Sequence, residues 1–235
     1  MYIKDKKFFL TDNPLTVNGE RRKVVVLYAD IRGFSDWSKD ISLTKVSELV
    51  QIVYERVIQL SVDYYHVFHK FLGDGFLLLW EVPNGEDYSN YISLAIGASF
   101  EIHKKYWYLY AGDKTLPSGF GIGISCGEAV KIQPATFIPE LNELDFVGYP
   151  MNCGARMQTL AGAYGVVIDS AVSKVVSENI DNKFSNFELL NADEHSLLRA
   201  KVFKGLRVYD KKDFKYLTYP VLQKSLWETD GMFKK

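Results

Sequence analysis

The strongest constraint on the fold is the way apolar residues change their spacing along the first half of the chain. Residues 23–30 form a β-branched run bounded by polar residues, which is typical of a buried strand. Residues 42–66 then repeat apolar side chains at helical spacing, with Ser42 placed to act as an N-cap. The order strand, helix, hairpin, helix, strand predicts an α+β fold with a ferredoxin-like βαββαβ core.

The hairpin of this core is expected at Gly73-Asp74-Gly75, because an Asp-Gly pair between two apolar runs is a strong turn signal. Its strands are expected at residues 67–72 and 76–82, followed by a helix at 86–110 and a strand at 119–126. The core is followed by extra C-terminal elements. We expect a helix at 150–163, a strand at 166–169, a short helix at 170–177, and strands near 187–190, 200–203 and 206–209.

No repeat or Pro/Gly-rich linker divides the 235 residues, so we expect one domain at 23–210, with an N-terminal lead at 1–22 and a C-terminal tail at 211–235. The formal net charge is -1, without the basic surplus of a protein that binds nucleic-acid duplexes. The apolar runs are too short to span a bilayer, and the first residues lack the apolar core of a signal peptide. With two cysteines and no disulfide framework, we expect a cytoplasmic protein without a membrane partner.

Two aspartates stand out by their position. Asp30 ends the first strand, just before a turn at Gly33, and Asp74 lies at the hairpin tip. The expected topology places these strands side by side, so the two carboxylates share one end of the sheet. Paired carboxylates beside a glycine turn suit a magnesium ion that bridges to phosphates. The residues alone leave an alternative open, in which Asp74 is an ordinary hairpin aspartate and Asp30 caps the start of a helix.

Three segments together resemble the signatures of the class III nucleotide cyclase domain. They are Asp30-Ile-Arg-Gly-Phe-Ser35, Lys70-Phe-Leu-Gly-Asp74-Gly-Phe and Asp145-Phe-Val-Gly-Tyr-Pro-Met-Asn152-Cys-Gly-Ala-Arg156-Met. They occur in the order that the family shows, and the resemblance covers residues 23–209. It implies an enzyme that converts a nucleoside triphosphate into a 3′,5′-cyclic nucleotide and pyrophosphate.

The resemblance assigns a role to each matching residue. It implies that two divalent ions, Mg²⁺ or Mn²⁺, are held by Asp30, Asp74 and the carbonyl of Ile31. Backbone groups are expected to hold the triphosphate at Gly33, Phe34 and Ser35. Asn152 would orient the ribose and Arg156 would stabilise charge on the α-phosphate, while Lys204 would meet the terminal phosphates. In this family the aspartates and the Asn/Arg pair of one site come from different subunits, which implies a head-to-tail homodimer.

The base is expected to meet Lys70 and Asp145, one donor and one acceptor, which suit adenine, cytosine and uracil alike. Tyr54 falls near the position where many family members carry a smaller asparagine, and its ring could fill the space of a purine's second ring. The open alternative is that Tyr54 is an ordinary surface or core aromatic residue without a role in base selection.

The compact chain also resembles the stand-alone pyrimidine cyclases of bacterial Pycsar anti-phage systems, whose product activates a separate effector protein. We therefore predict UTP as substrate and cyclic UMP as second messenger. The alternatives are a cytidylate cyclase, a soluble adenylate cyclase, and an inactive cyclase-homology module that serves dimerisation. An RNA-binding ferredoxin-like domain is disfavoured by the charge balance.

Overall fold

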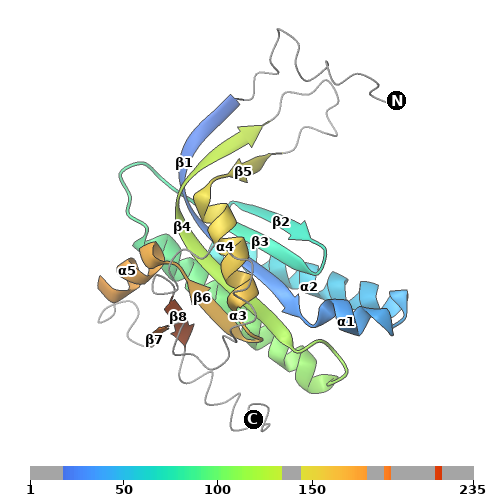
Figure 1. Cartoon of the computed structure of the whole chain (residues 1–235). Helices are drawn as coiled ribbons and strands as arrows, with labels where there is room; N and C mark the ends of the chain where they lie inside the picture. Colours follow the sequence, from blue (N-terminus) through green and yellow to red (C-terminus); the bar gives the residue numbers. More distant parts are fainter. Residues whose placement is uncertain (1–17, 134–143, 179–187, 192–214, 219–235) are drawn as a thin grey trace, which may run out of the picture.

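The computed structural model describes residues 18–133, 144–178, 188–191 and 215–218, whose strands form one eight-stranded sheet (Figure 1). The strand order is β2-β3-β1-β4-β6-β8-β7, and β5 pairs with β4 beside this path. In chain order the elements are β1 (Asn18–Arg32), α1 (Phe34–Lys39), α2 (Leu43–Tyr64), β2 (Phe68–Leu72), β3 (Gly75–Val82), α3 (Ser89–Gly112), β4 (Gly119–Gln133), β5 (Asp145–Val147), α4 (Tyr149–Leu160), β6 (Gly165–Ile168), α5 (Ser170–Glu178), β7 (Glu188–Asn191) and β8 (Lys215–Thr218).

The predicted βαββαβ core is confirmed. Strand β1 lies between β3 and β4 and is antiparallel to both, while β2 pairs with β3 as the other half of the hairpin. Strands β1 and β4 are longer than the sequence predicts, because they pair without a break from Asn18 opposite Gln133 to Arg32 opposite Gly119. Ion pairs support this polar extension, with the guanidinium Nε of Arg22 lying 3.4 Å from the carboxylate of Glu81 on β3.

The two faces of the sheet carry different layers, with α4 in front of the strands and α2 and α3 behind them in Figure 1. We call the side covered by α2 and α3 the α2/α3 face, and the side covered by α4 the α4 face. The main core lies on the α2/α3 face and contains Trp80, Phe76, Leu60, Ile96 and Ile122, all nearly inaccessible. A smaller cluster on the α4 face includes Val24, Val26, Leu77, Leu79, Phe146 and Met151.

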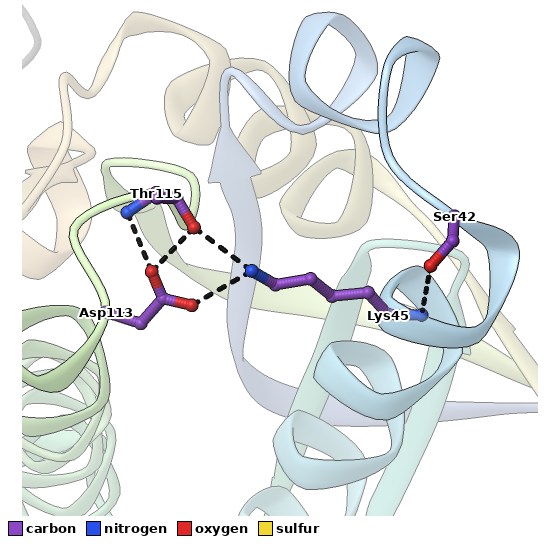
Figure 2. A network of polar contacts seen from close by, with 4 residues as sticks. All are labelled: Ser42, Lys45, Asp113 and Thr115. Carbon is purple, nitrogen blue, oxygen red and sulfur yellow. Dashed lines mark hydrogen bonds and ion pairs between the residues drawn. The ribbon is translucent and has the colours of Figure 1, made fainter.

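Polar contacts tie the start of α2 to the connection between α3 and β4 (Figure 2). The side chain of Ser42 accepts a hydrogen bond from the Lys45 backbone N–H at 3.3 Å, so the predicted N-cap is confirmed. The Lys45 ammonium lies 3.0 Å from the Asp113 carboxylate and 3.1 Å from the Thr115 hydroxyl. Hydrogen bonds from Thr115, together with Lys45, lower the pKa of Asp113 to about 2.

Helix α4 lies directly on β4 because glycines remove the side chains between them. A Cβ atom on Gly123 would lie 2.5 Å from the Gln158 amide nitrogen and 2.9 Å from the Met157 Cβ. A Cβ atom on Gly154 would lie 2.9 Å from the ring of Tyr28 on β1. This contact fixes the position of α4, which carries the third motif, against the central strands.

The C-terminal part of the sheet matches the sequence expectation in part. Strand β6, helix α5 and strand β7 are confirmed close to their expected positions. Strand β8 at 215–218 was not expected, and it pairs with both β6 and β7. The strands expected at 200–203 and 206–209, Lys204 and the loop at 134–143 lie outside the described residues. Of the helices that the structure describes, none combines the length and apolar character that a membrane span needs.

Candidate active site

The first two motifs meet at one end of the sheet. Asp30 on β1 lies opposite Gly75 on β3, and Asp74 is the neighbouring residue at the hairpin tip. Gly73 forms the turn with a φ angle of 77°, a conformation that favours glycine. The predicted juxtaposition of the two strand ends is therefore confirmed, and both aspartates are partly exposed there.

The charges around Asp30 favour a cation at this end of the sheet. Burial raises the pKa of Asp30, the Arg32 guanidinium lowers it, and the negative charge of Asp74 raises it again. Two carboxylates that repel each other in a partly buried place are stabilised by a shared cation, and carboxylate oxygens are the ligands that Mg²⁺ and Mn²⁺ prefer. Among the described residues, no group of three or more His, Cys, Asp or Glu side chains is arranged to hold a metal ion by itself. The residues present thus suit an ion that takes its other ligands from backbone, water or phosphate oxygens.

The chain turns sharply after Arg32, at the segment expected to hold phosphates. Gly33 caps α1 with a φ angle of 78°, and its carbonyl accepts a hydrogen bond from the Trp37 backbone N–H at 3.0 Å. The ring centroids of Phe34 and Trp37, both on α1, lie 5.6 Å apart, and both rings pack against the main core, which anchors the short helix. Gly33 and Ser35 are exposed beside the two aspartate-bearing strand ends.

The third motif places Asn152 and Arg156 on the outer side of α4. They lie four residues apart, so they share one side of the helix, whereas Cys153, Gly154 and Met157 are buried against the sheet. Within the described residues, the side chains of Asn152 and Arg156 make no hydrogen bond or ion pair. Their polar groups are thus available to a ligand or to a second protein surface.

Lys70 and Asp145 are brought together on the α4 face. The Lys70 ammonium lies 2.8 Å from the Asp145 carboxylate, and both side chains are partly exposed. The rings of Phe68 and Phe146 meet edge to face at 5.2 Å and hold β2 beside β5. Burial, together with the charge of Asp145, raises the pKa of the nearby Tyr28 to about 12. The structure therefore presents a donor and an acceptor side by side.

Tyr54 lies on the opposite face from this pair. Its ring stacks on that of Phe71, with centroids 3.7 Å apart and planes inclined by 16°. Its hydroxyl donates a hydrogen bond to the carbonyl of Gly73 at 2.7 Å. Within one chain, Tyr54 thus contacts the hairpin that carries Asp74 and does not approach the Lys70–Asp145 pair. Burial, together with the charge of Asp74, raises the pKa of Tyr54.

One residue at the site was missed by the sequence reasoning. Arg32 lies between Asp30 and the turn at Gly33, and its Nη2 approaches the Asp30 carboxylate to 3.5 Å. The same nitrogen donates a hydrogen bond to the backbone carbonyl of Gln158 at 2.5 Å. The first motif already shows Arg32 two residues after Asp30. Its second partner, Gln158, is 126 positions away, and no sequence pattern indicated that contact.

Solved structures of nucleotide cyclases share this fold. The chain is similar to the adenylyl cyclase CyaB from P. aeruginosa, with 16% identity, a TM-score of 0.66, and coverage of 86% of this chain and 96% of that chain. It is similar to the guanylyl cyclase Cya2, with 18% identity, a TM-score of 0.60, and coverage of 85% and 91%. It is also similar to the guanylate cyclase domain of RhGC from Catenaria anguillulae in complex with GTP, with 14% identity, a TM-score of 0.64, and coverage of 85% and 98%.

These likenesses establish the architecture, an α+β domain with the fold of adenylyl and guanylyl cyclase catalytic domains. No family model and no curated protein sequence matches the chain. Because a fold can host several functions, the activity has to be argued from the site.

Proposed function

We propose that the protein is a nucleotide cyclase, which converts a nucleoside triphosphate into a 3′,5′-cyclic nucleotide and pyrophosphate. The observation that carries the proposal is the meeting of Asp30 and Asp74 at the ends of neighbouring strands, in a fold shared with adenylyl and guanylyl cyclases. The exposed pair of Asn152 and Arg156 on α4 adds the polar groups that the reaction needs.

Each residue has a chemical task in this reaction. The carboxylates of Asp30 and Asp74, with the carbonyl of Ile31, would hold two divalent cations, Mg²⁺ or Mn²⁺. When bound, these ions lower the pKa of the ribose 3′-hydroxyl and neutralise the triphosphate. Backbone groups of residues 33–35 would bind phosphate oxygens, and Lys204 is proposed to meet the terminal phosphates.

The bond-making step is an in-line displacement at the α-phosphorus. The ribose 3′-hydroxyl gives its proton to solvent water, and its oxygen forms the new bond to the α-phosphorus. The bond from the α-phosphorus to the oxygen that bridges to the β-phosphorus breaks, so that pyrophosphate leaves with the electron pair. Asn152 would hold the ribose in the orientation for attack. The guanidinium of Arg156 would stabilise the charge that spreads over the phosphate oxygens, a task for which its planar fork is well suited.

The outward direction of Asn152 and Arg156 supports sites shared between two chains. These side chains point away from their own sheet, so a second surface has to close the site around the substrate. We propose a head-to-tail homodimer in which one subunit supplies Asp30 and Asp74 and its partner supplies Asn152 and Arg156. Each dimer then holds two equivalent sites.

For the base we propose a pyrimidine, with UTP ahead of CTP. In a shared site, Tyr54 would lie beside the aspartates of one subunit and face a base held by Lys70 and Asp145 of the other. The phenol would narrow the space for the second ring of a purine. The product would act as a second messenger on a separate effector in anti-phage defence. ATP remains the alternative substrate, since the Lys70–Asp145 pair suits adenine as well, and an inactive dimerisation module is the second alternative.

The test is to incubate the purified chain with each of the four nucleoside triphosphates and Mn²⁺ and to identify the products by mass spectrometry. We expect cyclic UMP as the main product in the wild type and none in Asp74→Asn, whose thermal unfolding serves as the control for folding. Cyclic AMP as main product would replace the pyrimidine proposal by the adenylate alternative. No cyclic product from any nucleotide, in a folded protein, would favour the inactive module.

A further inference from the structure

Arg32 contacts two residues, one at the candidate metal end of the sheet and one on α4. Its Nη2 lies 3.5 Å from the Asp30 carboxylate. The same Nη2 donates hydrogen bonds to the backbone carbonyl of Gln158 at 2.5 Å and to the side-chain carbonyl of Gln158. Gln158 follows Arg156 by two residues on α4, so one guanidinium contacts both functional elements of a single chain.

A glycine on β4 leaves the space through which the Arg32 side chain reaches α4. Gly121 lies opposite Asp30 in the sheet. A Cβ atom on Gly121 would lie 2.7 Å from Arg32 Nη2 and 2.6 Å from the carbonyl of Ala161, just beyond α4. The missing side chain leaves the space in which the guanidinium lies, and the Arg32 side chain is 22% exposed. Strand β4 begins with the run Gly119-Phe-Gly-Ile-Gly123, and the Arg32 side chain accounts for its second glycine.

We propose that Arg32 is a positioning residue that couples the two halves of the candidate site within one chain. It holds α4 through Gln158 and at the same time neutralises part of the charge on Asp30. The inference rests on the proposed function, because in a dimer with shared sites these halves belong to two different active sites. Arg32 then links the metal half of one site to the Asn/Arg half of the other.

If Arg32 couples the two halves, its removal should change metal binding and turnover in opposite directions. A guanidinium beside Asp30 repels a cation bound by the same carboxylate, so its removal should strengthen metal binding. Removal also releases the end of α4, so the side chain of Arg156 is held less firmly and turnover should fall. If a residue only supports the fold, its removal would not strengthen metal binding while it lowers turnover.

The first experiment compares full-length wild type with Arg32→Met and Arg32→Lys. Mn²⁺ binding is measured without nucleotide by the electron paramagnetic resonance of the free ion, and kcat and KM are measured at saturating Mn²⁺. For Arg32→Met we expect Mn²⁺ to bind about two- to fivefold more tightly, the effect of losing a partly exposed ion pair. We expect kcat to fall about tenfold or more. Arg32→Lys keeps the charge, so its Mn²⁺ affinity should stay near wild type.

Gln158→Ala is the matched control, because it removes one acceptor on α4 and leaves the Asp30 contact intact. It should lower kcat without a change in Mn²⁺ affinity. Unchanged or weaker Mn²⁺ binding by folded Arg32→Met overturns the inference. This readout needs no catalysis, so it decides the role of Arg32 even where the wild type yields no cyclic product and the proposed function itself fails.

The second experiment places Arg32→Met in either member of a complementing pair. In a heterodimer of Asp74→Ala and Arg156→Ala chains, the intact site takes its metal half from the Arg156→Ala chain and its α4 half from the other. We expect Arg32→Met to have a different effect in each chain. In the Arg156→Ala chain it should shift the Mn²⁺ dependence, and in the Asp74→Ala chain it should lower turnover at saturating Mn²⁺. Unchanged turnover when Arg32→Met lies in the Asp74→Ala chain, or an unchanged Mn²⁺ dependence when it lies in the Arg156→Ala chain, overturns the coupling.

Discussion

Gly75 sets the distance between β1 and β3 at the point where the candidate site lies. A Cβ atom on Gly75 would lie 2.7 Å from the Ala29 carbonyl oxygen and 3.3 Å from a carboxylate oxygen of Asp30. Real Cβ atoms do not approach a backbone oxygen so closely, so any side chain here has to push β1 and β3 apart. The position of the Asp30 carboxylate thus depends on the absence of one methyl group in the facing strand.

We expect Gly75→Ala to destabilise the protein by about 1–3 kcal/mol, as overpacking in a well-packed site does. Turnover should fall with it, because the displaced atoms belong to Ala29 and to Asp30. Urea unfolding and initial rates are the measurements. Gly112→Ala at the end of α3 is the matched control, since a Cβ atom there meets nothing within 4 Å. Full activity in destabilised Gly75→Ala would contradict the link to Asp30.

Tyr54 can act through its ring or through its hydroxyl, and two substitutions separate these roles. If the ring excludes purines, Tyr54→Asn should raise kcat/KM for ATP relative to UTP by about tenfold to a hundredfold, which corresponds to the steric cost that it relieves. Tyr54→Phe keeps the ring and loses the hydrogen bond to Gly73, so it should lower kcat/KM for both nucleotides alike. An unchanged ATP/UTP ratio in folded, active Tyr54→Asn would place the selectivity elsewhere.

At the scale of elements, α3 holds a buried histidine that makes stability depend on pH. His103 is 1% exposed, and its ring lies 5.7 Å from that of Tyr164. Burial lowers the pKa of His103 to about 3, and the nearby backbone of Gly165 opposes this shift. Because a histidine in the unfolded chain has a pKa of about 6.5, the unfolded state takes up the proton first as the pH falls. The stabilisation is therefore present above pH 6.5 and is lost progressively toward pH 3.

We expect the free energy of unfolding to fall by about 1.4 kcal/mol per pH unit from His103 within this window. Urea unfolding at pH 7 and pH 5 measures the slope, and His103→Leu should give a shallower one. Some slope should persist in this variant, because burial and His69 also lower the pKa of His66 to about 4. Equal slopes in wild type and His103→Leu would show that His103 is not protonated preferentially in the unfolded chain.

Helices and strands whose apolar residues recur at a regular spacing were predictable from the sequence. The contacts between these elements were less predictable. The helical spacing in α2 and the Asp-Gly turn of β2 and β3 are local signals, and both led to the observed elements. The polar ends of β1 and β4 carry no such signal, since residues such as Arg22 are placed there by pairing with another strand. The contact of Arg32 with Gln158 depends on how α4 lies on β4, which no local pattern contains.

At the scale of the whole molecule, sharing of sites can be tested by mixing two inactive variants. Asp74→Ala lacks a metal aspartate, and Arg156→Ala lacks the arginine of α4. If subunits exchange at random, half of the dimers are mixed, and each holds one intact site and one with both lesions. We expect about a quarter of the wild-type activity to return on mixing.

The control for this experiment is a pull-down with two different affinity tags, which shows that the subunits exchange. Each variant alone should stay inactive and should unfold at the temperature of the wild type. A mixture that exchanges and yet stays inactive would mean that one chain builds each site from its own residues. In that case Arg156 would have to turn toward its own aspartates.

Strand β8 has a consequence for any attempt to shorten the protein. It joins the sheet from residues 215–218, and it is the strand between β6 and β7. A truncation after residue 210 would remove it and leave β6 with a row of unpaired backbone groups, which is a template for pairing with other chains. Such a fragment would keep all three motifs and would still be expected to aggregate. Strand β8 therefore protects the backbone groups of β6 from pairing with another chain.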